Sequence, residues 1–256
     1  DVCSSDLVVA AYQISAGTIK KYSQNLLQSS VENQASQIEA WLNENLASFQ
    51  MAKTIIEDLK PSDEELKTIL DGYYGYNSNY PEGLYVADST GQLITASEST
   101  KKESDVTNST WYKEGLTRVN MAVGSAYQNA DGVNVISASG ILNDGSDKVR
   151  VISADMTLDR IAIIVNSFIE MNDAEAFLVD KTSGVILANR DSSLISQTLG
   201  AEGQSHFYQL TAEKAAEKDY NFATLDGNMT VFQEVDGTNW LLISYIPTSI
   251  VLSDLT

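Results

Sequence analysis

The sequence predicts an α+β fold: one long N-terminal helix followed by two tandem modules, each a five-stranded antiparallel sheet flanked by helices. Two observations predict it. Residues 7–59 contain no proline and only one glycine, Gly17, so a helix can run through them without a break. The rest of the chain carries an internal repeat, because Asp88 and Asp180, each in a similar turn, lie 92 residues apart.

The charge of the chain narrows the classes of partner. With 35 acidic and 16 basic side chains among 256 residues, the formal net charge is −19, which disfavours binding to nucleic acid and to anionic membrane surfaces.

Cys3 is the only cysteine, so no internal disulfide forms, and it lies in a leader, residues 1–7, whose native origin the sequence leaves open. No run of 18 apolar residues occurs, so we expect no membrane-spanning segment within these residues.

The N-terminal helix is expected over about residues 7–59, or roughly 75 Å at 1.5 Å per residue. Such a length exceeds what a globular domain needs and is typical of a stalk, a coiled coil or a rod that links two modules. Apolar residues fall near heptad spacing along it, which favours pairing with a second copy of the helix. They are Tyr22, Leu26, Ile38, Leu42 and Phe49.

The elements of the first module follow in order. Pro61 ends the long helix, and Ser62 with Glu65 three residues later forms a capping box that opens a second helix through about Leu70. Alternating β-rich residues around Gly91 predict a hairpin, and "STWYKEGLTR" predicts a helix. Turns such as "NADG" separate further antiparallel strands, and "TLDRIAIIVNSFI" returns to helix.

The second module repeats this order. "AEAFLVDKTSGVILANR" echoes "EGLYVADSTGQLITASE", and "NWLLISYIPTSIV" echoes "KVRVISADMTLDRI". Each copy predicts a hairpin, a helical insertion and a three-strand meander, which together make a five-stranded sheet. We therefore expect three regions: a stalk helix at 1–60, a first module at 61–170 and a second module at 171–256.

The long leading helix, the two sheet modules and "VISADMTLDRI" closing the first module together resemble a double Cache domain, over about Tyr22 to Leu252. Double Cache domains are PAS-like extracytoplasmic sensor regions of bacterial chemoreceptors, histidine kinases and cyclic-dinucleotide enzymes. The resemblance implies that transmembrane helices flank this region in a full receptor, which sits in the cell membrane and forms a homodimer through the N-terminal helix. It also implies that the first module is membrane-distal and binds a small-molecule ligand.

Catalytic, cofactor and metal sites are not expected. His206, the only histidine, has no cysteine, nucleophile elbow or metal-spaced partner beside it and is expected at a helix start as a structural residue. The phosphate-binding patterns GxGxxG and GxxxxGK[ST], the calcium-loop pattern and HExxH are all absent. The sequence thus predicts that the chain is not an enzyme and uses no cofactor.

Asp155 is the leading candidate for ligand binding. It ends the apolar strand "VRVISAD" and precedes the helix "MTLDRI", a position at which an aspartate either caps the helix N-terminus or presents its carboxylate to a ligand. The resemblance favours the second role, since it implies that an aspartate at this strand end of the membrane-distal module faces the pocket and takes a ligand amine.

Four further residues match positions that the resemblance assigns to the pocket. Trp111 and Tyr112 match a "WY" pair at the start of the pocket-lining helix. Because helix neighbours cannot face the same way, we expect one to pack and the other to face the pocket, unless the turn presents both; packing in the core is the alternative. Tyr127 and Asn129, two residues apart in a strand, share one sheet face.

Ser109 marks a departure from amino-acid-binding double Cache domains. The resemblance places an arginine that clamps a ligand carboxylate two residues before the tryptophan; here Ser109 stands there, with Asp105 upstream. The nearest basic residues, Lys101, Lys102 and Lys113, are expected to be solvated. Without a cation for a carboxylate, the predicted ligand is nucleobase-like, an amine or a modified amino acid.

The second module lacks these features, because Tyr245 and Pro247 stand at the strand end where the first module has Asp155. We therefore predict the extracytoplasmic ligand-sensing domain of a bacterial transmembrane chemoreceptor, which binds its ligand in the membrane-distal module and signals by a small shift of the long helix. The alternatives are the sensor of a histidine kinase or diguanylate cyclase that binds an amino acid or small carboxylate, and an extracellular spacer that binds nothing.

Overall fold

The computed structural model of the chain describes residues 2–169 and 171–253. The chain divides into two compact units. The central unit comprises Glu39–Ile161, and the flanking unit comprises Asp1–Ile38 together with Ala162–Thr256, the two segments that flank the central one in sequence. The division into regions 1–60, 61–170 and 171–256 stays a prediction.

Helix α1 (Val2–Leu59) is continuous over 58 residues, as the absence of proline predicts. It ends where Lys60 adopts a left-handed backbone conformation (φ 48°), directly before Pro61, which cannot continue a helix. No helix in the described part of the chain is long and apolar enough to cross a bilayer. The pairing of α1 with a second copy stays a prediction.

Within the central unit, α1 buries an apolar stripe. Leu42, Phe49, Ala52 and Ile56 are buried, and the ring of Phe49 meets that of Tyr80 edge-on, with 4.6 Å between the ring centroids. These positions recur at intervals of three, four or seven residues, so they lie on one side of the helix. In this stretch the apolar spacing therefore marks the side of α1 that packs against its own chain.

Helix α2 (Asp63–Asp71) begins at the predicted capping box. Ser62 Oγ accepts a hydrogen bond from the Glu65 backbone N–H (3.2 Å) and donates one to Glu65 Oε1 (3.0 Å). The cap satisfies a backbone donor that the first turn of a helix leaves free, so α2 can start with only three residues between it and α1.

The central unit folds around an antiparallel sheet with the strand order β2-β1-β6-β5-β3. The predicted meander is confirmed with one difference: its first strand is divided into two short strands, β3 and β4, which both pair with β5. The sheet therefore has six strands. They are β1 (Leu84–Asp88), β2 (Leu93–Ile94), β3 (Ala122–Val123), β4 (Tyr127–Gln128), β5 (Asn134–Leu142) and β6 (Arg150–Thr157).

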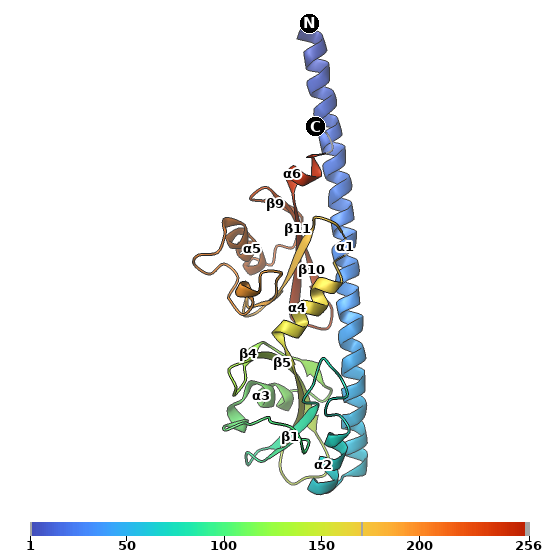
Figure 1. The fold of residues 1–256 in the computed structure, drawn as a ribbon, viewed down its shortest axis with the longest axis vertical. Coiled ribbons are helices and arrows are strands. Elements are labelled where there is room, and N and C mark those ends of the chain that lie inside the picture. Colours follow the sequence, from blue (N-terminus) through green and yellow to red (C-terminus); the bar gives the residue numbers. More distant parts are fainter. Residues whose placement is uncertain (1, 170, 254–256) are drawn as a thin grey trace. The chain divides into compact units, whose positions relative to one another are not determined.

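Helices cover both faces of this sheet (Figure 1). On one face lie α1 and α2, and on the other lie the 3₁₀ turn η1 (Val106–Asn108) and helix α3 (Thr110–Leu116). Because side chains alternate along a strand, every second residue of β1, β5 and β6 points to the second side, which we call the α3 face. A core cluster lies there, formed by Tyr85, Ala87, Val106, Trp111, Tyr112 and Val151.

The flanking unit repeats this topology with the strand order β8-β7-β11-β10-β9. Its core cluster includes Phe207 of helix α5 (His206–Ala216), the counterpart of α3. The predicted repeat and fold class are thus confirmed. The remaining elements of the chain are α4 (Leu158–Ser167), β7 (Glu175–Asp180), β8 (Ile186–Ala188), η2 (Ser192–Leu194), β9 (Ala223–Leu225), β10 (Asn228–Val235), β11 (Trp240–Pro247) and α6 (Thr248–Val251).

Arg150, at the start of β6, ties α2 to the hairpin that joins β5 and β6. Its Nη1 donates to Asp144 Oδ2 (2.9 Å) and its Nη2 to Asp63 Oδ1 (2.7 Å). The side chains of Arg150 and Asp144 are only 8% and 3% exposed. Removing the guanidinium would therefore leave a buried carboxylate unpaired.

Arg150→Ala is expected to destabilise the chain by about 3 kcal/mol, because the Asp144 carboxylate stays buried without its partner. Urea unfolding followed by circular dichroism measures the loss. The matched control is Lys181→Ala, which breaks the more exposed pair between Lys181 and Glu234 (2.9 Å) and is expected to cost less than about 1 kcal/mol. Equal losses in the two variants would contradict this assignment.

Candidate ligand-binding site

The α3 face of the central sheet changes from apolar to polar along its strands. Ser137 and Ser139 of β5 and Ser153 of β6 point to this face and are fully buried. Ser139 lies opposite Ser153, and Ser137 lies opposite Asp155. Buried hydroxyls weaken an apolar core, so such a patch beneath a helix is typical of a site that holds something polar.

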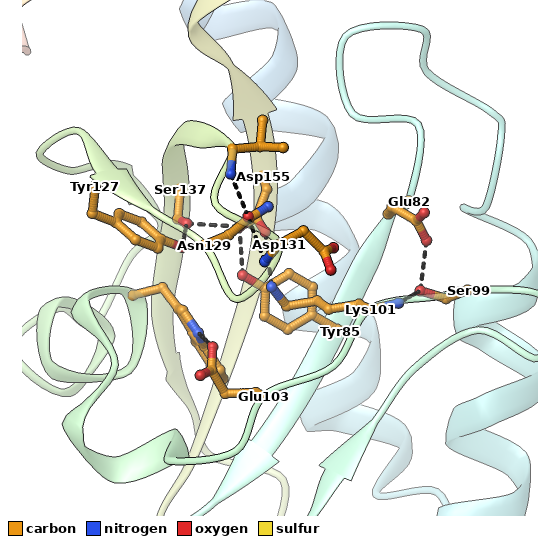
Figure 2. A network of polar contacts seen from close by, with 12 residues as sticks. Glu82, Tyr85, Ser99, Lys101, Glu103, Tyr127, Asn129, Asp131, Ser137 and Asp155 are labelled. Atoms are coloured by element: carbon orange, nitrogen blue, oxygen red, sulfur yellow. Dashed lines mark hydrogen bonds and ion pairs between the residues drawn. The ribbon is translucent and has the colours of Figure 1, made fainter. Parts of the chain in front are cut away.

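Asp155 lies at the centre of this patch. Its Oδ1 accepts hydrogen bonds from Tyr85 Oη (2.5 Å) and Ser137 Oγ (2.7 Å), and its Oδ2 forms an ion pair with Lys101 Nζ (2.9 Å). Ser137 Oγ is in turn hydrogen-bonded to Tyr127 Oη (2.5 Å). Figure 2 shows these four side chains directed toward Asp155 from four separate segments.

The position of Asp155 excludes one of the two roles that the sequence allows. Asp155 lies inside β6, and helix α4 begins only at Leu158. Thr157 Oγ1, rather than Asp155, accepts the hydrogen bond from a first-turn N–H, that of Arg160 (3.3 Å). The helix-capping interpretation of Asp155 is therefore wrong.

The burial of Lys101 differs from a second expectation. Its side chain is 8% exposed, so the prediction that it is solvated is wrong. Besides the ion pair with Asp155, the ammonium group lies 4.2 Å from the centroid of the Tyr85 ring and 5.9 Å from that of Trp111, both within cation–π range. The polar loop that precedes η1 carries no periodic pattern, so nothing in the sequence indicated that it brings this lysine over β1.

Three tyrosine hydroxyls surround the carboxylate. Burial, and next the negative charge of Asp155, raise the pKa of Tyr80, Tyr85 and Tyr127 above the usual range of a tyrosine. All three therefore stay neutral donors near neutral pH. Tyr80 Oη is buried and has no hydrogen-bond partner among the described residues, which is uncommon.

A cavity of about 190 Å³ opens beside the ion pair. Asp155, Lys101 and Asn129 contribute polar groups to its wall, while Val133 and Val135 are among the apolar residues there. Asn129 Oδ1 accepts hydrogen bonds from the backbone N–H groups of Asp131 (3.0 Å) and Val133 (2.9 Å), so it holds the turn between β4 and β5. A cavity of this volume suits a small metabolite.

Trp111 and Tyr112 both lie in the core. Trp111 is fully buried, packs edge-on against Tyr85, and donates from Nε1 to Glu103 Oε2 (3.2 Å). Tyr112 Oη donates to the backbone oxygen of Val149 (2.9 Å), just before β6 begins and far along that strand from Asp155. A helix lying flat on a sheet buries a wide stripe, which is why two neighbouring aromatics are both covered.

Ser109 and Asp105 make only local contacts. Ser109, directly before α3, donates to the backbone oxygen of Val106 (2.5 Å). Asp105 is exposed and accepts a hydrogen bond from Asn108 Nδ2 (2.9 Å). Of the seven residues that the sequence suggested, Asp155 and Asn129 line the cavity, and Tyr127 is linked to Asp155 through the Ser137 hydroxyl. The other four do not line the cavity.

The residues that sequence reasoning missed are Lys101, Tyr85 and the buried serines. For the serines a signal existed, since "ISASG" and "VISAD" place Ser137, Ser139 and Ser153 at alternate positions of otherwise apolar strands. Alternate positions share one face, so a polar stripe was available to be recognised.

The corresponding face of the flanking unit is more apolar, although Thr230 there takes the place of Ser137. Matching the registers of the two sheets gives each counterpart: Phe177 replaces Tyr85, Ile243 replaces Ser153, Phe232 replaces Ser139 and Tyr245 replaces Asp155. These side chains belong to or pack against the core cluster of that unit. The polar face with its buried ion pair is thus a property of the central unit, although the two sheets share one topology.

A family model described as a Cache domain, in its double form, matches residues 11–255. The chain belongs to the Cache domain family. Cache domains of this form are ligand-binding domains rather than enzymes, and among the described residues of this one no group of three or more histidine, cysteine or acidic side chains could hold a metal ion. No curated protein sequence is significantly similar to the chain.

Solved structures of ligand-binding domains of bacterial chemoreceptors share this fold. The ligand-binding domain of the Pseudomonas fluorescens chemoreceptor CtaA, in complex with L-isoleucine, superposes with a TM-score of 0.74 at 20% identity, covering 94% of this chain and 98% of that one. The domain of the Campylobacter jejuni chemoreceptor Tlp3, in complex with L-norvaline, gives 0.71 at 17% identity, with 91% and 94% covered. The Pseudomonas aeruginosa amino acid chemoreceptor PctB, in complex with L-Gln, gives 0.68 at 18% identity, with 91% and 94% covered.

Lys101→Met and Asp155→Asn are each expected to destabilise this Cache domain by about 2–4 kcal/mol, because each leaves a buried charge unpaired. The double variant should cost less than the sum of the two by about 1–3 kcal/mol, since it leaves no lone charge. Urea unfolding of the four proteins measures this coupling. In the control cycle on Lys214 and Asp219, a pair of half-exposed side chains 3.1 Å apart, the coupling should stay below about 1 kcal/mol. Additive losses at Lys101 and Asp155 would show that their contact contributes nothing.

Proposed function

We propose that this Cache domain is the extracytoplasmic ligand-binding domain of a bacterial chemoreceptor, and that its central unit binds an α-amino acid at Asp155 and Lys101. One observation carries the proposal: of two sheets with the same topology, the central one has a buried ion pair beside a cavity in place of the larger, mostly apolar side chains of the flanking one. A core has no need of that replacement, whereas a binding site does.

The ion pair indicates the chemistry of the ligand. A zwitterion can insert between the two side chains, with its ammonium group on Asp155 Oδ2 and its carboxylate on Lys101 Nζ, atoms that lie 2.9 Å apart without it. Tyr85 and Ser137 continue to donate to Asp155 Oδ1. Both buried charges then keep a partner, which avoids the large cost of leaving either one unpaired.

This ligand class differs from the one that the sequence favoured. The preference for a nucleobase, an amine or a modified amino acid rested on the lack of a cation for a carboxylate and on an aromatic side chain expected to face the pocket. Lys101 supplies the cation, and Trp111 and Tyr112 pack in the core. A simple amine would satisfy Asp155 and leave Lys101 unpaired, and a simple carboxylate would do the reverse.

The structural neighbours support the same class. CtaA was solved with L-isoleucine, Tlp3 with L-norvaline and PctB with L-Gln. Each of these domains matches nearly the whole length of this chain. An amino acid is also within the size that a cavity of about 190 Å³ admits. We include in the proposal that this chain acts in a chemoreceptor, is anchored in the cell membrane and forms a homodimer. The alternatives are the sensor of a histidine kinase or diguanylate cyclase, and a spacer that binds nothing.

Helix α1 offers a route for the signal. Gln50 Oε1 accepts a hydrogen bond from the Met121 backbone N–H (2.9 Å), and Glu57 Oε2 accepts one from the Asn143 backbone N–H (2.8 Å), so α1 is tied to the central unit by polar contacts as well as by packing. In the flanking unit, Gln34 Nε2 of the same helix donates to the Val165 backbone oxygen (3.0 Å). A ligand that binds one arrangement of these contacts more tightly than another would shift the helix between two states.

Isothermal titration with the common L-amino acids, nucleobases, short amines and short carboxylates tests the proposal. At least one amino acid should bind, and at 100 times its Kd it should stabilise the domain by about 2.7 kcal/mol. Asp155→Asn should weaken binding about 100-fold or more, because the ligand ammonium loses its charged partner.

Two controls locate the site. Tyr112→Phe removes a hydroxyl that bonds Val149, away from the cavity, and should leave the affinity within about twofold. Tyr245→Phe alters the residue that stands in the place of Asp155 in the flanking unit and should also bind as the unaltered chain does. A panel in which no compound binds would favour the spacer, and tight binding of a nucleobase alone would restore the ligand class that the sequence suggested.

A further inference from the structure

We infer that Lys101 is a tethered competitor that excludes simple amines from the site, and so makes the domain respond only to amines that carry an anionic group as well. The inference deepens the proposed function, because it concerns selectivity at the same site. It starts from the surroundings of the Lys101 ammonium group.

These surroundings are those that a ligand ammonium group would need. Lys101 Nζ lies 2.9 Å from Asp155 Oδ2 and 4.2 Å from the centroid of the Tyr85 ring, with the Trp111 ring at 5.9 Å. A carboxylate combined with aromatic faces is the usual arrangement by which proteins hold an organic cation. In Figure 2 the lysine side chain reaches from its loop across Tyr85 to this position, so the subsite for a cation is occupied by the protein itself.

A free amine would gain nothing by replacing Lys101. It would form one ammonium–carboxylate contact and break another of the same kind, and it would lose its translational freedom on binding. The tether gives Lys101 an effective concentration on the order of millimolar or more, which a dissolved amine must exceed. Exclusion therefore follows from the balance of contacts and needs no steric block.

An amino acid changes this balance. Its carboxylate offers the displaced Lys101 a new partner, so the number of ion pairs in the site rises from one to two when the ligand enters. The binding free energy then comes from the added pair and from the ligand side chain. Lys101 thus makes the carboxylate of the ligand a requirement.

The charges around the cavity favour cations once Lys101 is removed. Three carboxylates line it, those of Glu82, Asp131 and Asp155, against two ammonium groups, those of Lys101 and Lys102. Glu82 is engaged by Ser99 Oγ (2.6 Å) and Thr100 Oγ1 (3.2 Å). Without Lys101, three carboxylates would face one exposed ammonium group, and Asp155 would be free to take an amine.

Matched pairs of compounds test this inference on the whole chain. Each pair is an amino acid and the amine left by its decarboxylation: L-serine with ethanolamine, L-valine with isobutylamine, and L-arginine with agmatine. Isothermal titration and thermal melting are run on the unaltered chain, Lys101→Met, Lys101→Ala, Lys101→Arg and Lys102→Ala. At least one amine should bind Lys101→Met or Lys101→Ala about tenfold or more tightly than it binds the unaltered chain.

The control variants separate competition from a general loss of charge. Lys101→Arg keeps a cation on the tether and should exclude amines as before, while Lys102→Ala removes an exposed charge from the same cavity and should gain no amine binding. In Lys101→Met the amine should also raise the midpoint of thermal unfolding, because it fills the place of the missing ammonium group beside Asp155. This rescue is measurable even where the variant is less stable.

Three outcomes would each overturn the inference. In the first, Lys101→Met and Lys101→Ala fold but bind all three amines no better than the unaltered chain does. In the second, the unaltered chain binds an amine as tightly as the matching amino acid, and in the third, Lys102→Ala gains as much amine affinity as the Lys101 variants. Failure of the proposed function is distinct from these. If the unaltered chain binds no amino acid while Lys101→Met gains an amine, the competitor role of Lys101 stands and the proposed ligand class falls.

Discussion

The buried ion pair between Lys101 and Asp155 is the constraint on which the rest of the central unit depends. Two charges with side chains only 8% and 15% exposed persist only where other polar groups complete their hydrogen bonding. That requirement explains the hydroxyls of Tyr85, Ser137 and Tyr127 around the carboxylate, which would otherwise weaken the core. The segments that cover the sheet include a loop, and this loop carries Lys101 to the carboxylate.

The remainder of the unit offsets the cost of this polar patch. Trp111 and Tyr112 cover the apolar part of the α3 face, and the opposite face packs against buried residues of α1 that include Leu42, Phe49 and Ile56. Arg150 fastens the far end of β6 to α2 and to the β5–β6 hairpin, so the strand that carries Asp155 is held at its other end. The carboxylate of the ion pair is therefore placed on a regular strand, which positions a side chain more accurately than a loop does.

Much of the fold could be predicted, because its features are periodic or local. The proline-free helix, the capping box of Ser62 and the repeat of about 92 residues each appear in the chain itself. Asp155 and Tyr127 were reachable from their strands together with the family resemblance, whereas Asn129 lies in the turn after β4 and not on the strand face that the spacing predicted. Lys101 was not reachable, because its burial depends on the path of an aperiodic loop. The burial of both Trp111 and Tyr112 also depends on how α3 lies on the sheet, which helical spacing alone leaves open.

The matched registers of the two sheets have an evolutionary consequence. The same backbone positions hold Tyr85 and Asp155 in one unit and Phe177 and Tyr245 in the other, while the strand order is unchanged. The ladder of main-chain hydrogen bonds therefore specifies the scaffold without specifying what the α3 face displays. Descendants of such a duplicated module can exchange a packed interior for a chemically selective one by a few substitutions. A lineage can in this way acquire or lose a sensory specificity without passing through an unfolded ancestor.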